Sequence, residues 1–153
     1  VLGERWPNRD HVFTTILNAT TDTNANVRIT ALRVLGERWP NRDHVFTTIL
    51  NATTDTNAHV RETTARTLTW QYQETSCSVL MELAADEVSD DLRAGLVSMI
   101  TLAWPNEPDI SAFLRNRAVN DASEKVRTSA EKGIAFLHLR SDLVAEQEVP
   151  TAG

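Results

Sequence analysis

The sequence predicts an all-α fold, an α-solenoid of stacked antiparallel helical hairpins with about ten helices when partial ones are counted. Three observations predict it. The first 66 residues are a 33-residue segment written twice, with 29 of the 33 positions identical. Apolar residues continue to recur with nearly the same period, and glycine and proline are few, at five residues each. One hairpin cannot bury its own apolar stripe, so units of this period stack on one another.

The first helix of each unit is marked by a Val-Arg or Leu-Arg pair, which begins at residues 27, 60, 92 and 126. Positions four, seven and eight residues later are mostly apolar, as on one face of an α-helix. Three residues before each pair stand Asn24, Asn57, Ser89 and Ser123, and such residues are preferred N-caps. We therefore expect helices at 25–38, 58–71, 90–103 and 124–139.

A second helix follows each first one after a break. Trp-Pro-Asn at 6–8, 39–41 and 104–106 ends the first helix, because proline disfavours helical geometry in the residue before it. Apolar stripes then predict second helices at 42–53, 76–85 and 108–119, a copy of the first of these one unit earlier, and a short remnant at 142–148. Pro108 is expected in the first turn of its helix.

The register divides the chain into an array at 1–148 and a flexible tail at 149–153. The units are 1–23, which is partial, and 24–56, 57–88, 89–122 and 123–148. Val1 corresponds to Val34, so the chain begins inside a first helix, without the polar capping repeat that solenoids normally need. We expect it to be a fragment of a larger array.

The pattern Asp-Thr-Asn-Ala-Asn-Val-Arg-x-x-Ala-x-x-x-Leu at 22–35 resembles the HEAT repeat, especially its short bacterial, phycobilisome-lyase-like form. Similar text recurs at 55–68, 87–100 and 121–134. Residues 102–127, which contain a Trp-Pro pair, are similar to HEAT arrays behind bacterial NACHT-type signalling NTPases. That resemblance implies a sensor or docking role. The sequence holds no Gly-x-x-x-x-Gly-Lys-Ser/Thr loop for phosphate, so the NTPase itself is not in this chain.

Composition narrows the classes of partner. The formal net charge of −6 is concentrated after residue 66, and the chain lacks the basic stripe used for non-specific nucleic-acid binding. No apolar run reaches the roughly 18 residues of a membrane span. Cys77 is the single cysteine and is interpreted as core filler rather than a nucleophile. We expect a soluble, cytoplasmic protein that binds no membrane, and we do not expect nucleic acid as a partner.

Charged residues recur in two columns of the register, one of arginine and one of acidic residues a few positions earlier. The columns consist of Asp22, Arg28, Asp55, Arg61, Glu87, Arg93, Asp121 and Arg127. The planar fork of arginine bridges carboxylates and carbonyls of adjacent units. We interpret the columns as a structural ladder between units rather than as a recognition strip.

The second helices line the concave face of a HEAT-like stack, and this face is the one most suited to a partner. Residues outside the apolar stripe of these helices form the candidate binding face: Thr14, Thr15, Asn18, Thr47, Thr48, Asn51, Glu82, Arg115 and Arg117. No catalytic, cofactor or metal residue is assigned, since the four histidines show no metal-ligand spacing.

The resemblance to HEAT arrays and the lack of assigned catalytic residues together favour a non-catalytic protein-recognition or scaffold module of a larger bacterial protein, without a cofactor. Its expected partners are proteins that the sequence does not identify, and another domain of the parent chain. Two alternatives stay open. One is a HEAT-like enzyme, such as a chromophore lyase or a DNA glycosylase, which would need an acid and aromatic residues converging in a pocket. The other is a structural spacer between neighbouring domains.

Overall fold

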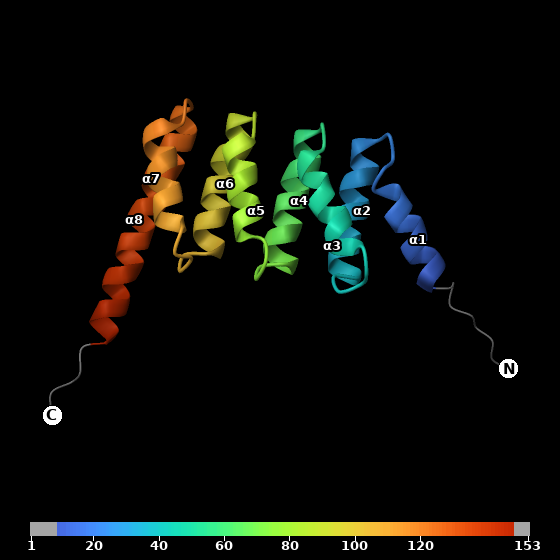
Figure 1. Cartoon of the computed structure of the whole chain (residues 1–153), viewed down its shortest axis with the longest axis horizontal. Helices are drawn as coiled ribbons and strands as arrows, with labels where there is room; N and C mark the ends of the chain where they lie inside the picture. Colours follow the sequence, from blue (N-terminus) through green and yellow to red (C-terminus); the bar gives the residue numbers. More distant parts are fainter. Residues whose placement is uncertain (1–8, 149–153) are drawn as a thin grey trace. The chain divides into compact units, whose positions relative to one another are not determined.

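The structure, a computed structural model, describes residues 9–148, and no strand occurs among them (Figure 1). Its elements are α1 (Arg9–Ala19), α2 (Ala25–Arg38), α3 (Val45–Asn51), the 3-10 helix η1 (Ala52–Thr54), α4 (Ala58–Gln71), α5 (Cys77–Asp86), α6 (Asp90–Ala103), α7 (Ile110–Asn120) and α8 (Glu124–Gln147). The predicted all-α fold is confirmed. The expected number of about ten helices is too high for the part described, which contains eight α-helices. One expected partial helix lies outside the described residues.

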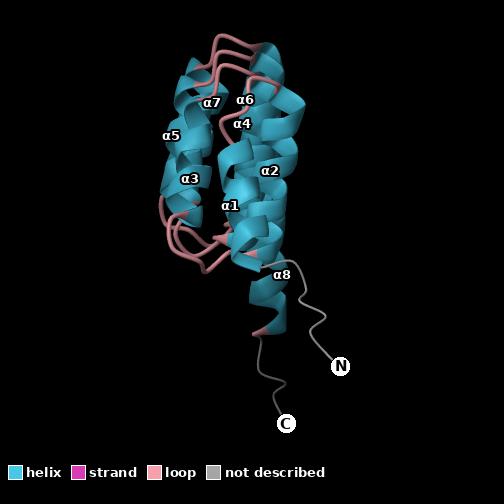
Figure 2. Ribbon diagram, turned by 90° about the vertical axis from the view of Figure 1, so that its right-hand side faces the viewer, coloured by secondary structure: helices cyan, strands magenta, loops and turns pink. Residues whose placement is uncertain are grey.

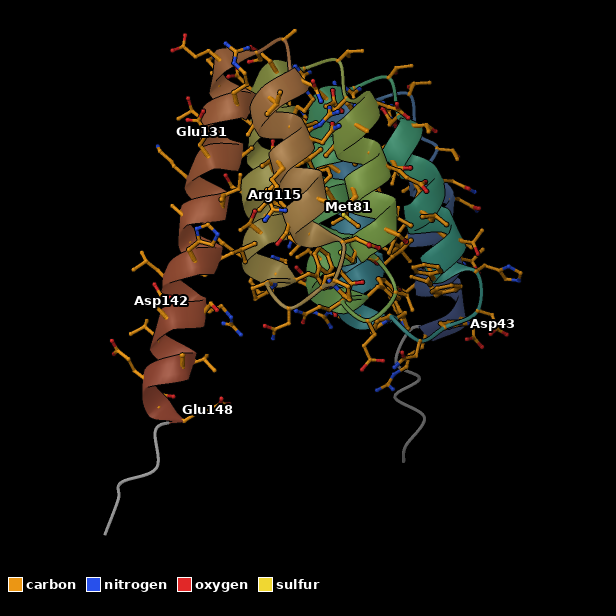
Figure 3. The ribbon with its side chains drawn as sticks, turned by 60° about the vertical axis from the view of Figure 1, so that its left-hand side comes forward. Asp43, Met81, Arg115, Glu131, Asp142 and Glu148 are labelled. Atoms are coloured by element: carbon orange, nitrogen blue, oxygen red, sulfur yellow. The ribbon has the colours of Figure 1, made fainter. Side chains whose placement is uncertain are left out.

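The last helix, α8, also makes the number of helices smaller than predicted. α8 runs without a break for 24 residues, whereas the sequence predicted a helix at 124–139 and a separate remnant at 142–148. No proline or glycine occurs after Gly133 within α8, so nothing interrupts its hydrogen bonding. At 1.5 Å per residue α8 is about 36 Å long and the 14-residue α6 about 21 Å. The end of α8 extends well beyond α6 and α7 (Figure 3).

The first helices begin at the predicted N-caps. The side chains of Asn24, Asn57 and Ser89 each accept a hydrogen bond from a backbone amide in the first turn of α2, α4 and α6. Ser123 is the N-cap of α8 but makes no such bond. Its hydroxyl instead donates to Asp90 Oδ2 at 3.2 Å. The capping prediction therefore holds for three side chains, and Ser123 departs from it.

Aromatic residues end the first helices. Trp39 and Trp104 are the C-caps of α2 and α6, as the Trp-Pro pattern predicted. In α4 the corresponding residue is Tyr72, whose hydroxyl donates to the Pro40 carbonyl oxygen at 2.6 Å. Trp70, two positions earlier, is 79% exposed. The Trp-Pro pattern does not occur at this position, so the sequence analysis did not identify Tyr72 as the residue that ends α4.

The second helices start later than predicted where the chain forms a tight turn. Residues 40–55 repeat 7–22 letter for letter, yet α1 begins at Arg9 while α3 begins only at Val45, after His44 with a positive φ of 70°. Identical local preferences cannot explain the difference. In the second copy Arg42 donates to Asp10 Oδ1 at 2.9 Å and covers the Phe13 ring at 3.8 Å, and these tertiary contacts draw Arg42 out of the helix.

The start of α7 differs from its prediction for a simpler reason. α7 begins at Ile110, so Pro108 lies in the turn before it and not in its first turn. Asp109 is the N-cap but makes no side-chain cap bond. Ile110 is the first residue of α7 and is buried, so the helix starts where its core contacts start.

The chain divides into two compact units, Val1–Ser76 and Cys77–Gly153. In the first unit α2 packs mainly on α4 and α1, and α3 packs on α2 and α4. In the second unit α8 packs on both α6 and α7, and α5 packs on α6. Figure 2 shows the two layers within each unit, with α2 and α4 apart from α3, and α6 and α8 apart from α5 and α7.

The core of each unit consists of the predicted apolar stripes. Fully buried side chains of the first unit include Leu35, Ile49, Val60 and Leu68, and those of the second include Leu80, Leu96, Ile100, Leu114 and Val126. Val27 holds the same register position as Val60 but is 38% exposed. Among the described residues no first helix precedes α2, so nothing covers Val27 from that side.

Candidate functional site

The arginine column makes the same local contact in every unit. Each guanidinium Nη1 donates to the backbone carbonyl of the acidic residue six positions earlier: Arg28 to Asp22 at 2.9 Å, Arg61 to Asp55 at 2.8 Å, Arg93 to Glu87 at 2.7 Å and Arg127 to Asp121 at 2.8 Å. The arginine therefore closes the turn that leads into its own helix.

Two of these arginines also bind a carboxylate of the following repeat. Nε and Nη2 of Arg28 lie 2.9 Å from the two carboxylate oxygens of Asp55. Arg93 holds Asp121 with the same two distances. Such paired, charge-assisted hydrogen bonds fix both position and orientation. The carboxylates of Asp55 and Asp121 thus link α2 to the turn before α4, and α6 to the turn before α8.

The acidic column has a contact of its own. One carboxylate oxygen accepts the amide of the residue two positions later, which is the N-cap: Asp22 from Asn24, Asp55 from Asn57, Glu87 from Ser89 and Asp121 from Ser123, at 2.8 to 2.9 Å. This Asx-type turn sets the chain for the helix that follows. The column is therefore built into the four turns that lead into α2, α4, α6 and α8.

The ion pairs shift the pKa of their partners. The hydrogen bond from Arg28 lowers the pKa of Asp55 below its ordinary value of 3.8, against burial, which raises it. Arg93 does the same to the pKa of Asp121. The Asp121 side chain is 2% exposed and that of Arg93 13%. Both carboxylates stay ionised at neutral pH, and neither is free to move a proton.

Three residues of the predicted binding face line a cavity in the first unit. The cavity has a volume of about 430 Å³ and lies between the C-terminal end of α1 and the end of α3 with η1. Its lining includes Asn18, Thr20, Thr48, Asn51 and Thr54, and the buried Leu32 of α2 also contributes. The cavity lies on residues that the 33-residue repeat presents twice.

The polar groups of this cavity fall into two kinds. The hydroxyls of Thr20 and Thr54 already donate to helix carbonyls, to Leu17 at 2.6 Å and to Asn51 at 3.1 Å. The side-chain amides of Asn18 and Asn51 are exposed and have no hydrogen-bond partner among residues 9–148. Each amide offers one acceptor and two donors. The free hydrogen-bonding capacity of the lining therefore rests on two asparagines, one repeat apart.

The cavity carries little net charge. Asp55 is the one ionisable residue in its described lining, and Arg28 pairs with it. A neutral polar group therefore fits the lining better than an ion, because a charged ligand would find no free counter-charge there.

The other predicted face residues lie apart from this cavity. Thr14, Thr15 and Thr47 are exposed on α1 and α3, and the Thr14 hydroxyl donates to the Asp10 carbonyl at 2.8 Å. They share helices with the cavity but not its lining.

In the second unit Glu82 on α5 and Arg115 on α7 are exposed; Figure 3 labels Arg115. Arg117 is 20% exposed and its Nη1 lies 3.5 Å from Asp121 Oδ2. The pocket described beside Arg115 contains neither Glu82 nor Arg117. The structure therefore does not bring these three predicted residues into one pocket of the described part.

Sequence reasoning missed the threonines at the helix ends. Asn-Ala-Thr-Thr-Asp follows at 18–22 and again at 51–55, and the structure places Thr20, Thr21 and Thr54 in the cavity lining. The prediction considered only the exposed side of the helices, and not the turns that follow them. The exact copying of this pentapeptide was the available signal.

The described residues offer few groups for metal binding or nucleophilic attack. In residues 9–148 no three His, Cys, Asp or Glu side chains gather closely enough to hold a metal ion. Burial, followed by the carboxylates of Glu107 and Asp109, raises the pKa of the Cys77 thiol to about 11. The thiol is therefore protonated at neutral pH and a poor nucleophile. None of the described helices has the length and apolar character to cross a membrane.

Comparison with protein families agrees with this arrangement of repeats. The profile of the family described as HEAT repeats matches residues 13–101, more than half of the chain. The chain belongs to the HEAT repeat family. The match covers α1 through most of α6 and so includes the cavity and the Arg28–Asp55 pair. No curated protein and no solved structure matched this HEAT-repeat sequence.

HEAT repeats commonly mediate protein–protein interaction or scaffolding. Within residues 9–148 the cavity beside Asn18 and Asn51 is one surface with free hydrogen-bonding groups, whereas most of the ladder residues are engaged with one another.

Proposed function

We propose that this HEAT-repeat chain is a non-catalytic recognition module that binds an extended segment of a partner protein across the cavity between α1 and α3. One observation carries the proposal: Asn18 and Asn51 present free side-chain amides from the same position of two nearly identical repeats. The ladder residues serve to hold the repeats in register.

A side-chain amide matches a peptide group, since each has one N–H donor and one carbonyl acceptor facing outward. Neighbouring helices pack about 8–10 Å apart, and an extended chain rises about 3.3 Å per residue. Asn18 and Asn51 would therefore bind peptide groups about three residues apart. Recognition of backbone groups by such a pair depends on extended conformation more than on side-chain identity.

The non-catalytic part of the proposal is supported by the lining of the cavity. Acid–base and nucleophilic catalysis need a group that changes protonation or attacks. Asp55 is ionised and paired with Arg28, and the hydroxyls of Thr20 and Thr54 are occupied by helix carbonyls. This favours recognition over the enzyme alternatives, a chromophore lyase or a DNA glycosylase.

The wider setting rests on resemblance alone. Residues 102–127 are similar to arrays behind bacterial NACHT-type NTPases, so we propose a sensor or docking role inside a larger cytoplasmic protein of bacteria. Glu82 and Arg115, both exposed, would add charged contacts. A phosphate-binding loop encoded upstream of Val1 in the parent gene would support this setting, and its absence would contradict it.

The recognition proposal can be tested with a phage library of random linear peptides selected on the immobilised full chain. A selected peptide should bind Asn18→Ala and Asn51→Ala each about tenfold more weakly, as expected for the loss of one or two hydrogen bonds, and should not bind the double variant measurably. N-methylation of single peptide bonds in the peptide should weaken binding at two positions about three residues apart.

Thr15→Ala and Thr47→Ala are the matched controls, because these residues lie on the same two helices outside the cavity lining. They should bind the peptide as the unchanged chain does. Peptides that bind the double asparagine variant equally well, or a library that yields no binder, would contradict recognition at this cavity. The second result would favour the structural spacer.

A further inference from the structure

An apolar stripe on α8 lies open to solvent in the second unit. Phe136, Leu139 and Leu143 are 37%, 63% and 59% exposed. They are spaced by three and four residues, so they share one side of the helix. Lys132 and Glu146 continue the same side at either end of the stripe and are also exposed. The stripe thus has an apolar centre with a positive and a negative end.

We propose that this stripe is a self-association surface, on which the α8 helices of two copies of the chain pack antiparallel about a two-fold axis at Leu139. The proposal is independent of the peptide cavity, since the stripe belongs to the second unit and the cavity to the first.

The order of residues makes the stripe complementary to itself. About an axis at Leu139, positions seven residues before and seven after meet, so Lys132 of each copy lies opposite Glu146 of the other. Phe136, three residues before the axis, lies beside Leu143, four residues after it, and Leu139 packs on its own copy. A two-fold axis requires this self-complementarity, and the spacing of three and four residues is that of a coiled-coil seam. Parallel pairing would set Lys132 against Lys132.

The two charged ends are available for this pairing. No ion pair of Lys132 or Glu146 occurs within the described part of the chain. By contrast, Lys125, which lies about two turns earlier on α8, is already bound to Asp91 at 2.6 Å. Partly shielded opposite charges across a helix pair add modest affinity but decide which orientation forms.

A cavity beside the stripe supplies a place for the partner's side chain. It has a volume of about 210 Å³, lies between α6 and α8, and its lining includes Leu102, Lys132 and Phe136. Leu102 is 66% exposed on α6. In the antiparallel arrangement Leu143 of the second copy comes to Phe136 and hence to the mouth of this cavity. Burial of these leucines is the main driving force.

The length of α8 leaves room for the second copy. The last turns of α8, from the labelled Asp142 toward Glu148 in Figure 3, extend past α6 and α7, and no other described element of the second unit covers them. Lys132 and Phe136 lie beside α6, and the rest of the stripe continues toward this extension. A single helix pair buries less than a standard interface of about 1,600 Å², so we expect a dimer that dissociates on dilution.

Sedimentation equilibrium of the full chain over a range of concentrations tests the proposal. The mean mass should rise from one copy toward two. Leu139→Glu should remain a single copy at every concentration. Val119→Glu is the matched control, since Val119 is 76% exposed on α7, away from the stripe, and it should associate as the unchanged chain does.

A charge exchange tests the orientation. Lys132→Glu and Glu146→Lys should each weaken association at least tenfold, because each sets like charges opposite one another. The double variant should restore it. Circular dichroism of every variant confirms that the helices remain folded; all of the changed residues are exposed.

Cross-linking tests the position of the axis. In a Cys77→Ser background, Leu139→Cys should form a disulfide-linked dimer on mild oxidation, because a residue on the axis meets its own copy within disulfide reach. His138→Cys, next along α8 but turned away from the stripe, should not. A chain that stays monomeric, association that survives Leu139→Glu, or a charge exchange that does not restore association would each overturn the proposal.

Discussion

Arg93 holds Asp121 by two parallel hydrogen bonds, with Nε and Nη2 each 2.9 Å from a carboxylate oxygen. Asp121 accepts at the same time the amide of Ser123, the N-cap of α8. One carboxylate therefore joins α6 to the start of α8. Arg28 and Asp55 repeat the arrangement between α2 and α4. The inter-helix turn and the contact between repeats depend on the same atoms.

We predict that Arg93→Ala lowers the free energy of unfolding by about 3 kcal/mol, the usual result of removing one partner from a buried ion pair. Asp121, whose side chain is only 2% exposed beside Arg93, would keep only the Ser123 amide and the more distant Arg117. Urea unfolding followed by circular dichroism measures the change. Arg115→Ala, at an exposed arginine of α7, should stay within about 0.5 kcal/mol. Equal effects of the two variants would refute a structural role for the pair.

We predict that acid destabilises the fold through Asp121 and Asp55. Both carboxyls have a pKa below 3.8 in the folded chain, chiefly because of the arginine hydrogen bond. A lowered folded-state pKa gives stability that is present above the unfolded-state pKa and is lost as the pH falls through the folded-state value. The free energy of unfolding should therefore begin to fall as the pH drops below about 4.

Asp121→Asn separates this effect from general acid unfolding. Asparagine retains an oxygen for the Ser123 amide but carries no charge. The variant should be less stable at pH 7 and should lose less further stability below pH 4 than the unchanged chain. An acid limb of unchanged slope would show that Asp121 does not titrate in this range.

Local signals explain how much of the fold could be predicted. The predicted ranges of α2, α4 and α6 are correct, because the N-cap and the proline or other residue that ends a helix lie within a few positions of its ends. The shortened α3 could not be predicted, since its sequence equals that of α1 and the two differ in tertiary contacts, such as those of Arg42 with Asp10 and Phe13. The uninterrupted α8 was missed because a break was assumed where no breaking residue stands.

The site was less predictable than the fold. Helical periodicity locates exposed positions, and it placed Asn18 and Asn51 on an exposed surface. It does not show that Arg117 turns back to Asp121, because that contact depends on where the next turn lies. Nor does it separate the buried Val126 of α8 from the exposed Leu139. Both fit an apolar pattern, and only the ends of α6 and α7 decide which is covered.

We predict that Gly133→Ala destabilises the second unit. A Cβ at Gly133 would lie 2.9 Å from Thr101 Oγ1 and 3.1 Å from Leu114 Cδ1, and Thr101 is held by its bond to the Val97 carbonyl. Overpacking of this kind costs about 1–3 kcal/mol. Gly95→Ala is the control, because no neighbouring atom lies within 4 Å of its Cβ position, and it should gain up to about 1 kcal/mol from helix propensity. Thermal unfolding of both variants should thus move in opposite directions.

We predict that Cys77 is alkylated slowly in the folded chain. Burial raises the pKa of its thiol to about 11, so at pH 8 the thiolate fraction is about 100-fold lower than in a thiol of ordinary pKa near 9. The rate of reaction with iodoacetamide should keep rising with pH up to about pH 11. At pH 8 the rate should increase when the chain is unfolded in urea.

Ser78→Cys in a Cys77→Ser background is the control, because it places an exposed thiol next to this position. Its reaction rate should level off near pH 9. Because Glu107 and Asp109 also raise the pKa of the thiol, neutralising both should speed alkylation of Cys77 at pH 8. A folded chain whose Cys77 reacts as fast as the exposed control would contradict its assignment as core filler.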